Sequence, residues 1–266
     1  MMTCDSFLTR LACEDACLVT VQATRGSVPR EVGAWMAVFD ADVLASIGGG
    51  HLEFQAIAQA RRRLSGHAGE PLMRYVLGAA LGQCCGGEVQ LRFERVDAAD
   101  IGALRTRLAP LRTPLALFGG GHVGRALVHV FASLPFHLSW IDSRDQIFPE
   151  ELPANVVTEH SDPVQTAVAA LAPHSRVLIM SFSHAEDLEL VAACLTRQRR
   201  QADLPYVGLI GSKTKWASFS HRLLARGFTA QELAHVTCPI GVDGISGKAP
   251  EVIAIAVAAQ ILRTLP

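Results

Sequence analysis

The feature that most constrains the fold of this chain is a glycine-rich loop between an apolar strand and a helix. The segment FGGGHVGRALVHVF holds Gly119, Gly121 and Gly124 in the spacing G-x-G-x-x-G, directly after the strand-like run PLALF. The run HLSWID then ends at Asp142, about twenty residues beyond the loop. This order of strand, glycine loop, helix and acidic strand end is the fingerprint of a dinucleotide-binding βαβ unit.

Each residue of this fingerprint has an expected task. The first glycine permits a tight turn, the second lets a pyrophosphate approach the backbone, and the third lets helix and strand pack closely. The helix that opens at His122 offers free N–H groups to an anion. Asp142 would accept hydrogen bonds from ribose hydroxyls and repel a 2′-phosphate. NAD(P) or another nucleotide is the expected ligand, while a loop used only for packing and a phosphate site for a different cofactor remain open.

The rest of the second half has the pattern of a parallel sheet. Its strands are continuously apolar and alternate with amphipathic helical segments, which is typical of strands covered on both faces. The strands expected are PLALFG, HLSWID, NVVTE, RVLIMSF and YVGLIG. We therefore predict a Rossmann-like domain over residues 114–266.

The first half has shorter strands and more turns, which predicts a small α+β domain over residues 1–97 with a mixed sheet. WMAVFD and VLASIG are close enough to form a hairpin, and HLEFQAIAQARRRL reads as a helix. EVQLRFERV alternates cleanly between apolar and polar residues. A linker or helix over residues 98–113 joins the halves, and the whole chain belongs to the α/β class.

Composition excludes several classes of protein. Half of the 266 residues are hydrophobic, 18% are charged and the formal net charge is −1. We therefore expect a buried core, no nucleic-acid partner and no membrane association. The N-terminus has no signal-peptide pattern, so the seven cysteines are expected to be reduced thiols in the cytoplasm.

Three glycine-bearing turns stand out in the first half: ATRGSVPREVG, IGGGHLE and LGQCCGG. Glycine allows positive φ and close ligand approach, so these turns are candidates to converge on one pocket, although spacing alone does not show it. The candidate binding residues on them are Gly48, Gly49, Gly50, His51, Gln83, Cys84 and Cys85.

The adjacent thiols of Cys84 and Cys85 are the most unusual of these candidates. Successive side chains usually diverge, so the pair does not suit one tetrahedral zinc site. A buried apolar pair is one interpretation, because free cysteine is among the most buried residues. The flanking glycines favour the other, in which a loop thiol acts as a soft metal ligand or sulfur carrier.

The remaining cysteines and two helix starts have ordinary explanations. Cys4, Cys13 and Cys17 are expected to face the core from an N-terminal helix, Cys194 to be core, and Cys238 to lie on a turn. Ser183 and Glu186 predict a capping box before the helix AEDLELV. His184 there and the lysines of LIGSKTKW fit either a ligand site or solvated helix ends.

Taken together, the motifs resemble one known family, XdhC/CoxI. The resemblance covers nearly the whole chain in order, and is carried by ATRGSVPREVG, IGGGHLE, LGQCCGG, LFGGGHVG, WIDSR, IGSKTKW and CPIGVDGISGKAPEVIAIAVAAQIL. It implies two domains, the second Rossmann-like, and a chaperone rather than an enzyme. It also implies binding of the molybdenum cofactor (molybdopterin), help in its sulfuration and its delivery to apo-xanthine dehydrogenase in purine catabolism, with a cysteine desulfurase as the sulfur source.

From this resemblance, Cys84 and Cys85 become candidate molybdenum contacts. The terminal phosphate of the pterin would suit the helix start at Gly119–Gly124 or the one at Gly48–Gly50. An NAD(P)-dependent oxidoreductase and a nucleotide-sensing regulatory module remain alternatives, although no hydride-transfer constellation is evident. The apolar segment 249–265 is a candidate homodimer contact.

Overall fold

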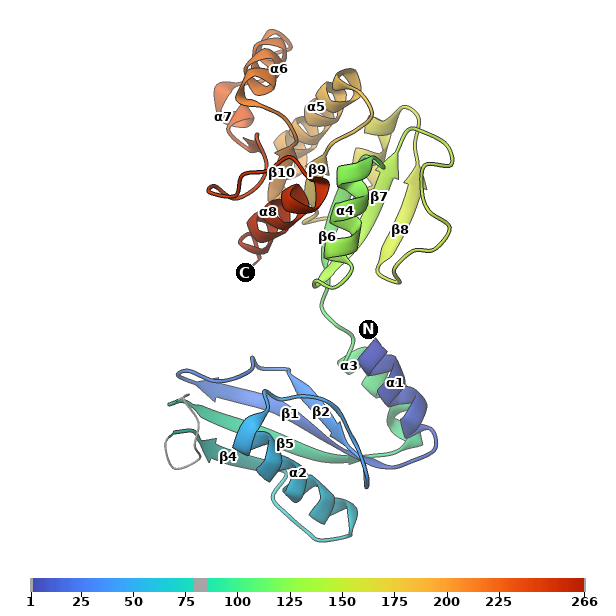
Figure 1. Cartoon of the computed structure of the whole chain (residues 1–266), viewed down its shortest axis with the longest axis vertical. Coiled ribbons are helices and arrows are strands. Elements are labelled where there is room, and N and C mark those ends of the chain that lie inside the picture. The colour runs from blue at the N-terminus through green and yellow to red at the C-terminus, as the bar shows by residue number, and fades with distance from the viewer. Residues whose placement is uncertain (1, 79–85, 266) are drawn as a thin grey trace. The chain divides into compact units, whose positions relative to one another are not determined.

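The chain divides into two units, one ending at Ala109 and the other beginning at Pro110. The computed structural model describes residues 2–78 and 86–265 (Figure 1), so Gln83, Cys84 and Cys85 lie outside the described residues. The interval 98–113 contains two short helical segments, η2 (Ala98–Asp100) and α3 (Ile101–Arg107), which precede the division.

The first unit is built on a five-stranded sheet with the strand order β3-β2-β1-β5-β4. Its other elements, in chain order, are α1 (Met2–Leu11), β1 (Ala16–Arg25), β2 (Trp35–Val38), β3 (Val43–Ala45), α2 (Gly50–Leu64), β4 (Leu72–Val76) and β5 (Glu88–Val96). All its strand pairings among the described residues are antiparallel. The α+β prediction holds, but the expected mixed sheet is wrong, because side-chain alternation is the same in parallel and antiparallel strands.

Alternation along the strands gives this sheet two apolar faces. Val19 of β1 and Leu91 of β5 pack with α2 on one face. Leu18, one position away from Val19, packs with α1 and α3 on the other. The clean alternation predicted for β5 is confirmed, since Val89, Leu91 and Phe93 are all buried on the α2 side.

The N-terminal cysteines correct the predicted extent of the first helix. α1 ends at Leu11, Cys13 is exposed on the turn that follows, and Cys17 is buried in β1. The strand begins this early because Cys17 pairs with Val38 on one side and with Arg95 on the other. Of these three cysteines, only Cys4 lies on a helix in the structure, and it is half-buried.

The second unit is a six-stranded parallel sheet with the order β11-β10-β9-β6-β7-β8. Its elements are β6 (Thr113–Phe118), α4 (His122–Phe131), β7 (Phe136–Asp142), β8 (Val156–His160), η3 (Val164–Ala170), β9 (Arg176–Ile179), α5 (His184–Gln201), β10 (Tyr206–Leu209), α6 (Lys213–Ala225), α7 (Ala230–Leu233), β11 (Val236–Thr237) and α8 (Pro250–Leu262). Renumbered within the unit, the order is 3-2-1-4-5-6 from β8 to β11, which is the Rossmann order. The predicted parallel sheet is confirmed.

Helices cover both faces of this sheet, as its continuously buried strands require. Leu115 and Leu117 of β6 pack with α4 and α8 on one face. Ala116 and Phe118 pack with α5, α6 and η3 on the other. Figure 1 shows α4 and α8 together in front of the strands. No helix in the described part of the chain has the length and apolarity needed to span a bilayer.

Strand β6 lies at the point where the direction of winding reverses. The chain passes from β6 to β7 and β8 on one side, and then to β9, β10 and β11 on the other. Ligands of open α/β sheets bind at the carboxyl ends of strands at such a reversal. Residues 143–155, between β7 and β8, contain no helix and form a long loop instead.

Candidate functional site

The turn around Ser27 touches two glycines of the first unit, Gly48 and Gly87. A Cβ added to Gly87 would lie 2.4 Å from the carbonyl oxygen of Ser27 and 2.6 Å from that of Arg25. A Cβ on Gly48 would lie 2.5 Å from Cβ of Pro29. The turn around Ser27 therefore touches both other turns through positions that have no room for a side chain. That the three turns line one pocket stays a prediction.

The second of these turns is held by the carboxylate of Glu53, in the first turn of α2. Its Oε2 accepts hydrogen bonds from Ser46 Oγ at 2.5 Å, Ile47 N at 2.9 Å and Gly49 N at 3.1 Å. The N–H of Gly48 donates to Ser46 Oγ at 3.0 Å. The backbone N–H groups of Gly48 and Gly49, which were candidates to bind a phosphate, thus already donate hydrogen bonds within the protein. This helix start is less suited to an anion than its glycines predicted.

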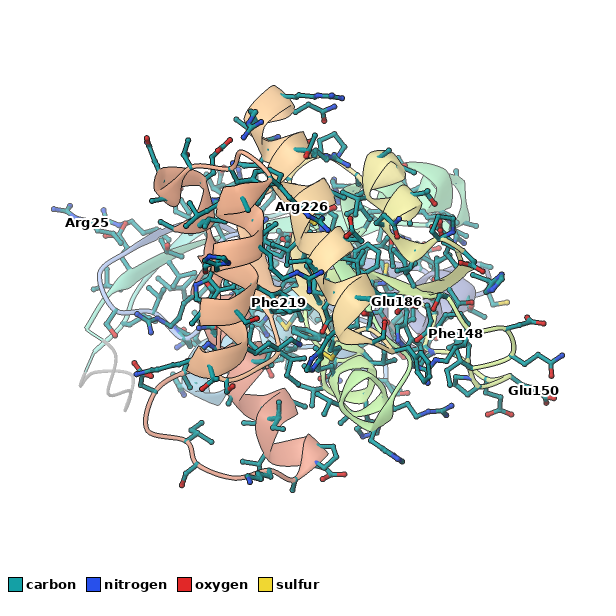
Figure 2. All side chains as sticks on the ribbon, turned by 90° about the horizontal axis from the view of Figure 1, so that it is seen from above. Arg25, Phe148, Glu150, Glu186, Phe219 and Arg226 are labelled. Atoms are coloured by element: carbon teal, nitrogen blue, oxygen red, sulfur yellow. The ribbon has the colours of Figure 1, made fainter. Side chains whose placement is uncertain are left out.

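The residues around this meeting point are polar and mostly exposed. Arg25 is exposed, and Figure 2 shows its side chain projecting away from its strand. Arg30 forms an ion pair with Glu31 at 2.9 Å, which lowers the pKa of the Glu31 carboxyl. His51 is exposed on the first turn of α2, with its Nε2 3.0 Å from Gln55 Nε2. The meeting point therefore offers cationic and imidazole groups to a ligand.

The glycines of the second unit fit the roles predicted from their spacing. A Cβ on Gly119 would lie 2.1 Å from the carbonyl oxygen of Met180, so the turn leaves no room for one. A Cβ on Gly124 would lie 2.0 Å from the carbonyl oxygen of Gly119, so α4 packs directly on the loop. Gly121 has no described atom within 4 Å of such a Cβ, and α4 has no side-chain cap there. His122 beside it is exposed.

Asp142 lies at the last position of β7, next to this loop, as its place in the sequence predicted. Its Oδ2 accepts from the N–H of Gly120 at 2.5 Å and from Arg144 Nη2 at 2.9 Å. Its Oδ1 accepts from the backbone N–H and the Nε of Arg144, at 2.8 and 2.9 Å. Burial alone would raise the pKa of this carboxyl, but the hydrogen bonds from Arg144 and Gly120 outweigh it and lower the pKa. Its role in ligand binding stays a prediction.

Two contacts join the ends of β7 and β9 over the end of β6. Ser143 Oγ donates to Glu186 Oε1 at 2.7 Å. The guanidinium of Arg144 lies 4.8 Å from the ring centroid of Phe182, which is 65% exposed. Figure 2 shows Glu186 at the start of α5. The predicted capping box is only half formed, because Ser183 caps α5 while Glu186 accepts from Phe182 N at 3.2 Å.

A buried ion pair lies farther along the same edge. Lys215 Nζ donates to Asp187 Oδ2 at 2.5 Å and to the carbonyl of Ile210 at 2.8 Å. Asp187 also accepts from the N–H and the hydroxyl of Ser181. Lys215 is therefore committed to a buried carboxylate and is not a free anion ligand. Sequence reasoning missed Asp187, which stands in no motif, and the contact of Arg144 with Asp142, which the motif WIDSR does not signal.

The other cysteines differ in burial. Cys194 is fully buried in α5, as predicted, and burial raises its pKa to about 12. Cys238 lies after β11 and is half-buried, and burial raises the pKa of its thiol too. The described residues contain no group of three or more His, Cys, Asp or Glu side chains placed to hold a metal ion.

Comparison with known families matches both units. The XdhC Rossmann domain family matches residues 115–261, and the XdhC and CoxI family matches residues 10–76. The uncharacterized protein YqeB of Escherichia coli is 26% identical over 246 residues, which cover 90% of this chain and 42% of YqeB. The chain thus spans less than half the length of this curated relative.

A solved structure from Bacillus halodurans, described as a xanthine dehydrogenase, has the same fold. It covers 99% of this chain and 96% of its own, with a TM-score of 0.77 and 20% sequence identity.

Proposed function

This chain belongs to the XdhC and CoxI family, and from that membership we propose that it is a chaperone for the molybdenum cofactor. In this role it binds the cofactor as cargo, protects it or assists its sulfuration, and inserts it into apo-xanthine dehydrogenase. Its partners would be that dehydrogenase and a cysteine desulfurase as the sulfur source. It would act in the cytoplasm, where thiols stay reduced, and it would be an accessory protein of purine catabolism rather than an enzyme.

The two backbone contacts of the Ser27 turn carry this proposal. Gly87, which follows Cys85 by two positions in the sequence, contacts this turn at Ser27, and Gly48 contacts it at Pro29. Positions without side chains let a bulky ligand approach the backbone closely. Thiolate sulfur is a suitable ligand for a soft metal centre. We infer that Cys84 or Cys85 contacts molybdenum or carries its sulfur, with Gln83, Gly48–Gly50 and His51 nearby in the binding surface.

Two observations fit the anionic cargo. Arg25 brings positive charge to the first-unit turns, whereas the charge of Arg30 is offset by Glu31. In the second unit, Gly121 and His122 open α4 without a side-chain cap.

The name of the Bacillus halodurans structure, a xanthine dehydrogenase, also fits the proposed client. If the predicted homodimer forms, Ile255 and Leu262 of α8 are exposed apolar residues that would suit its interface.

The test is to purify the protein from cells that make molybdopterin and from cells that do not, and to measure bound molybdenum and pterin. We expect stoichiometric cofactor only from the first, and its loss in the double variant Cys84→Ala/Cys85→Ala. Cys13→Ala is the matched control, since Cys13 is exposed elsewhere in the first unit. Transfer is then measured as recovered xanthine oxidation by the apo-dehydrogenase.

Single variants separate the two thiols. Because neighbouring side chains point in different directions, C84A and C85A should differ in severity. A double variant that binds and delivers sulfurated cofactor as well as the wild type would show that the thiols are structural.

A further inference from the structure

The carboxylate of Asp142 stands where a dinucleotide-binding fold holds the adenosine ribose, but none of its acceptor positions is free. An ionised carboxylate has about four lone-pair sites. Each carboxylate oxygen of Asp142 accepts two hydrogen bonds. Of these four bonds, Gly120 donates one and Arg144 donates three. Asp142 as a whole is 2% exposed to solvent. Arg144 therefore supplies the donors that the ribose hydroxyls would otherwise supply.

The glycine loop is also covered beside the pyrophosphate position, at Gly120, while Gly121 itself is open. In a Rossmann fold the pyrophosphate crosses the sheet at the reversal point, above the glycine loop. Here the N–H of Gly120 already donates to Asp142, and a Cβ on Gly120 would lie 2.6 Å from Cγ1 of Ile147. Ile147 belongs to the loop that replaces the helix after β7, and its carbonyl accepts from Arg125 Nη2 at 2.5 Å.

Contacts between residues that follow β7 and residues that follow β9 also cross the end of β6. β7 and β9 pair with opposite sides of β6. The Ser143–Glu186 hydrogen bond and the Arg144–Phe182 contact therefore run over the end of β6. A dinucleotide extended across the sheet would have to displace them.

We propose that Arg144 is a specificity-determining residue that closes the second unit to NAD-type dinucleotides by taking the place of the ribose hydroxyls. The unit keeps the glycine loop and the acidic residue of the fingerprint, but its own arginine completes the hydrogen bonding. This inference concerns the second unit alone and does not depend on the proposed cofactor role.

The experiment is a calorimetric titration of the full chain with NADH. The wild type is expected to bind with a dissociation constant on the order of 1 mM or weaker. Arg144→Met keeps an unbranched apolar stem but removes the guanidinium, so it should bind NADH at least about tenfold more tightly. Arg144→Met/Asp142→Asn should lose most of this gain, because the freed carboxylate is then replaced by a neutral amide with a single acceptor oxygen.

Arg199→Met is the matched control, since Arg199 forms an ion pair with Glu232 in the same unit but away from the loop. It should bind NADH as weakly as the wild type. If R144M does not fold, Arg144→Lys replaces it in the experiment. Lysine keeps the positive charge but lacks the several N–H donors of the planar guanidinium, so this variant should bind NADH a few-fold more tightly than the wild type. Micromolar binding by the wild type, or a folded Arg144 variant with no gain, would overturn the proposal.

Discussion

Gly87 lies so close to Ser27 that a Cβ on the glycine would be 2.4 Å from the serine carbonyl oxygen. This contact is between backbones, so no side-chain rotation can relieve it. Gly87→Ala should therefore separate the two turns and lower the free energy of unfolding by about 1–3 kcal/mol. Urea unfolding checks the stability, and bound molybdenum checks the site. Gly86→Ala is the control, because no described atom lies within 4 Å of its added Cβ. Equal stability of the two variants would contradict the packing described here.

The glycine loop of the second unit offers a similar comparison. Gly124→Ala would place a Cβ 2.0 Å from the carbonyl oxygen of Gly119, whereas Gly121→Ala meets no described atom within 4 Å. We expect G124A to lower the melting temperature by several degrees, since a loss of 1 kcal/mol shifts it by roughly 2–4 °C in a chain of this size. G121A should lower it less, because its Cβ meets no described atom and only the N-cap preference for glycine over alanine is lost. Differential scanning calorimetry makes the comparison.

Removing one partner of the buried Lys215–Asp187 pair should be costly. The side chain of Asp187 is 3% exposed and that of Lys215 is 10% exposed. Lys215→Met leaves the carboxylate without its cation, so we expect a loss of about 3 kcal/mol in unfolding free energy. Lys215→Met/Asp187→Asn should recover part of this loss, because the buried charge is gone. A double variant no more stable than K215M would show that the pair is not the source of the effect.

Acid should weaken the contribution of Asp142. Arg144 and Gly120 hold the pKa of this carboxyl below its ordinary value despite its burial. Its contribution is therefore fully present above the unfolded pKa of about 3.9 and is lost as pH falls through the lower folded pKa. The difference in unfolding free energy between the wild type and Asp142→Asn should be constant near neutral pH and shrink below about pH 4. Denaturant titrations across this range measure it. An unchanged difference in acid would argue against the ion pair.

The thiols should differ in reactivity in the native protein. Burial raises the pKa of Cys17 to about 11 and that of Cys194 to about 12, so both stay protonated near pH 8. Cys13 is exposed. Because the thiolate is the reactive form, iodoacetamide should modify Cys13 at least about tenfold faster than Cys17 or Cys194. Peptide mass spectrometry resolves the sites. Equally rapid labelling of Cys194 in folded protein would contradict its buried position.

Sequence patterns predicted the second unit more completely than the first. Strands such as β9 and β10 are buried at every position, and such runs between helices leave few arrangements other than a covered parallel sheet. In the first unit, the alternation of β5 predicted which residues are buried but not the direction of its neighbours. Its partners, β1 and β4, are set by tertiary pairing.

The N-terminal helix shows how pairing overrides local preference. Nothing in LACEDACL marks a break, since it holds no glycine or proline. The chain nevertheless leaves the helix after Leu11, because residues from Ala16 onward pair with β5 and bury Cys17. Propensity is a weak guide where tertiary contacts of this kind compete with it.

At the candidate site, the position of Asp142 was predictable and its partner was not. The spacing from the glycine loop fixes where the strand ends. Whether Arg144 turns back onto the carboxylate depends on the turn after β7, which one sequence does not determine. The contact between Gly87 and Ser27 was unpredictable for a similar reason, since it joins turns separated by most of the first unit.

The position of β1 in the centre of its sheet also affects how the chain is made. β1 pairs with β2, which follows soon after it, and with β5, which is the last strand of the unit. During synthesis, β1 therefore has one hydrogen-bonded edge satisfied early and the other exposed until Val96 has left the ribosome. Unpaired strand edges in such intermediates promote aggregation, and pairings between distant segments form slowly. A nascent chain arrested before β5 would accordingly need a holdase to stay in solution.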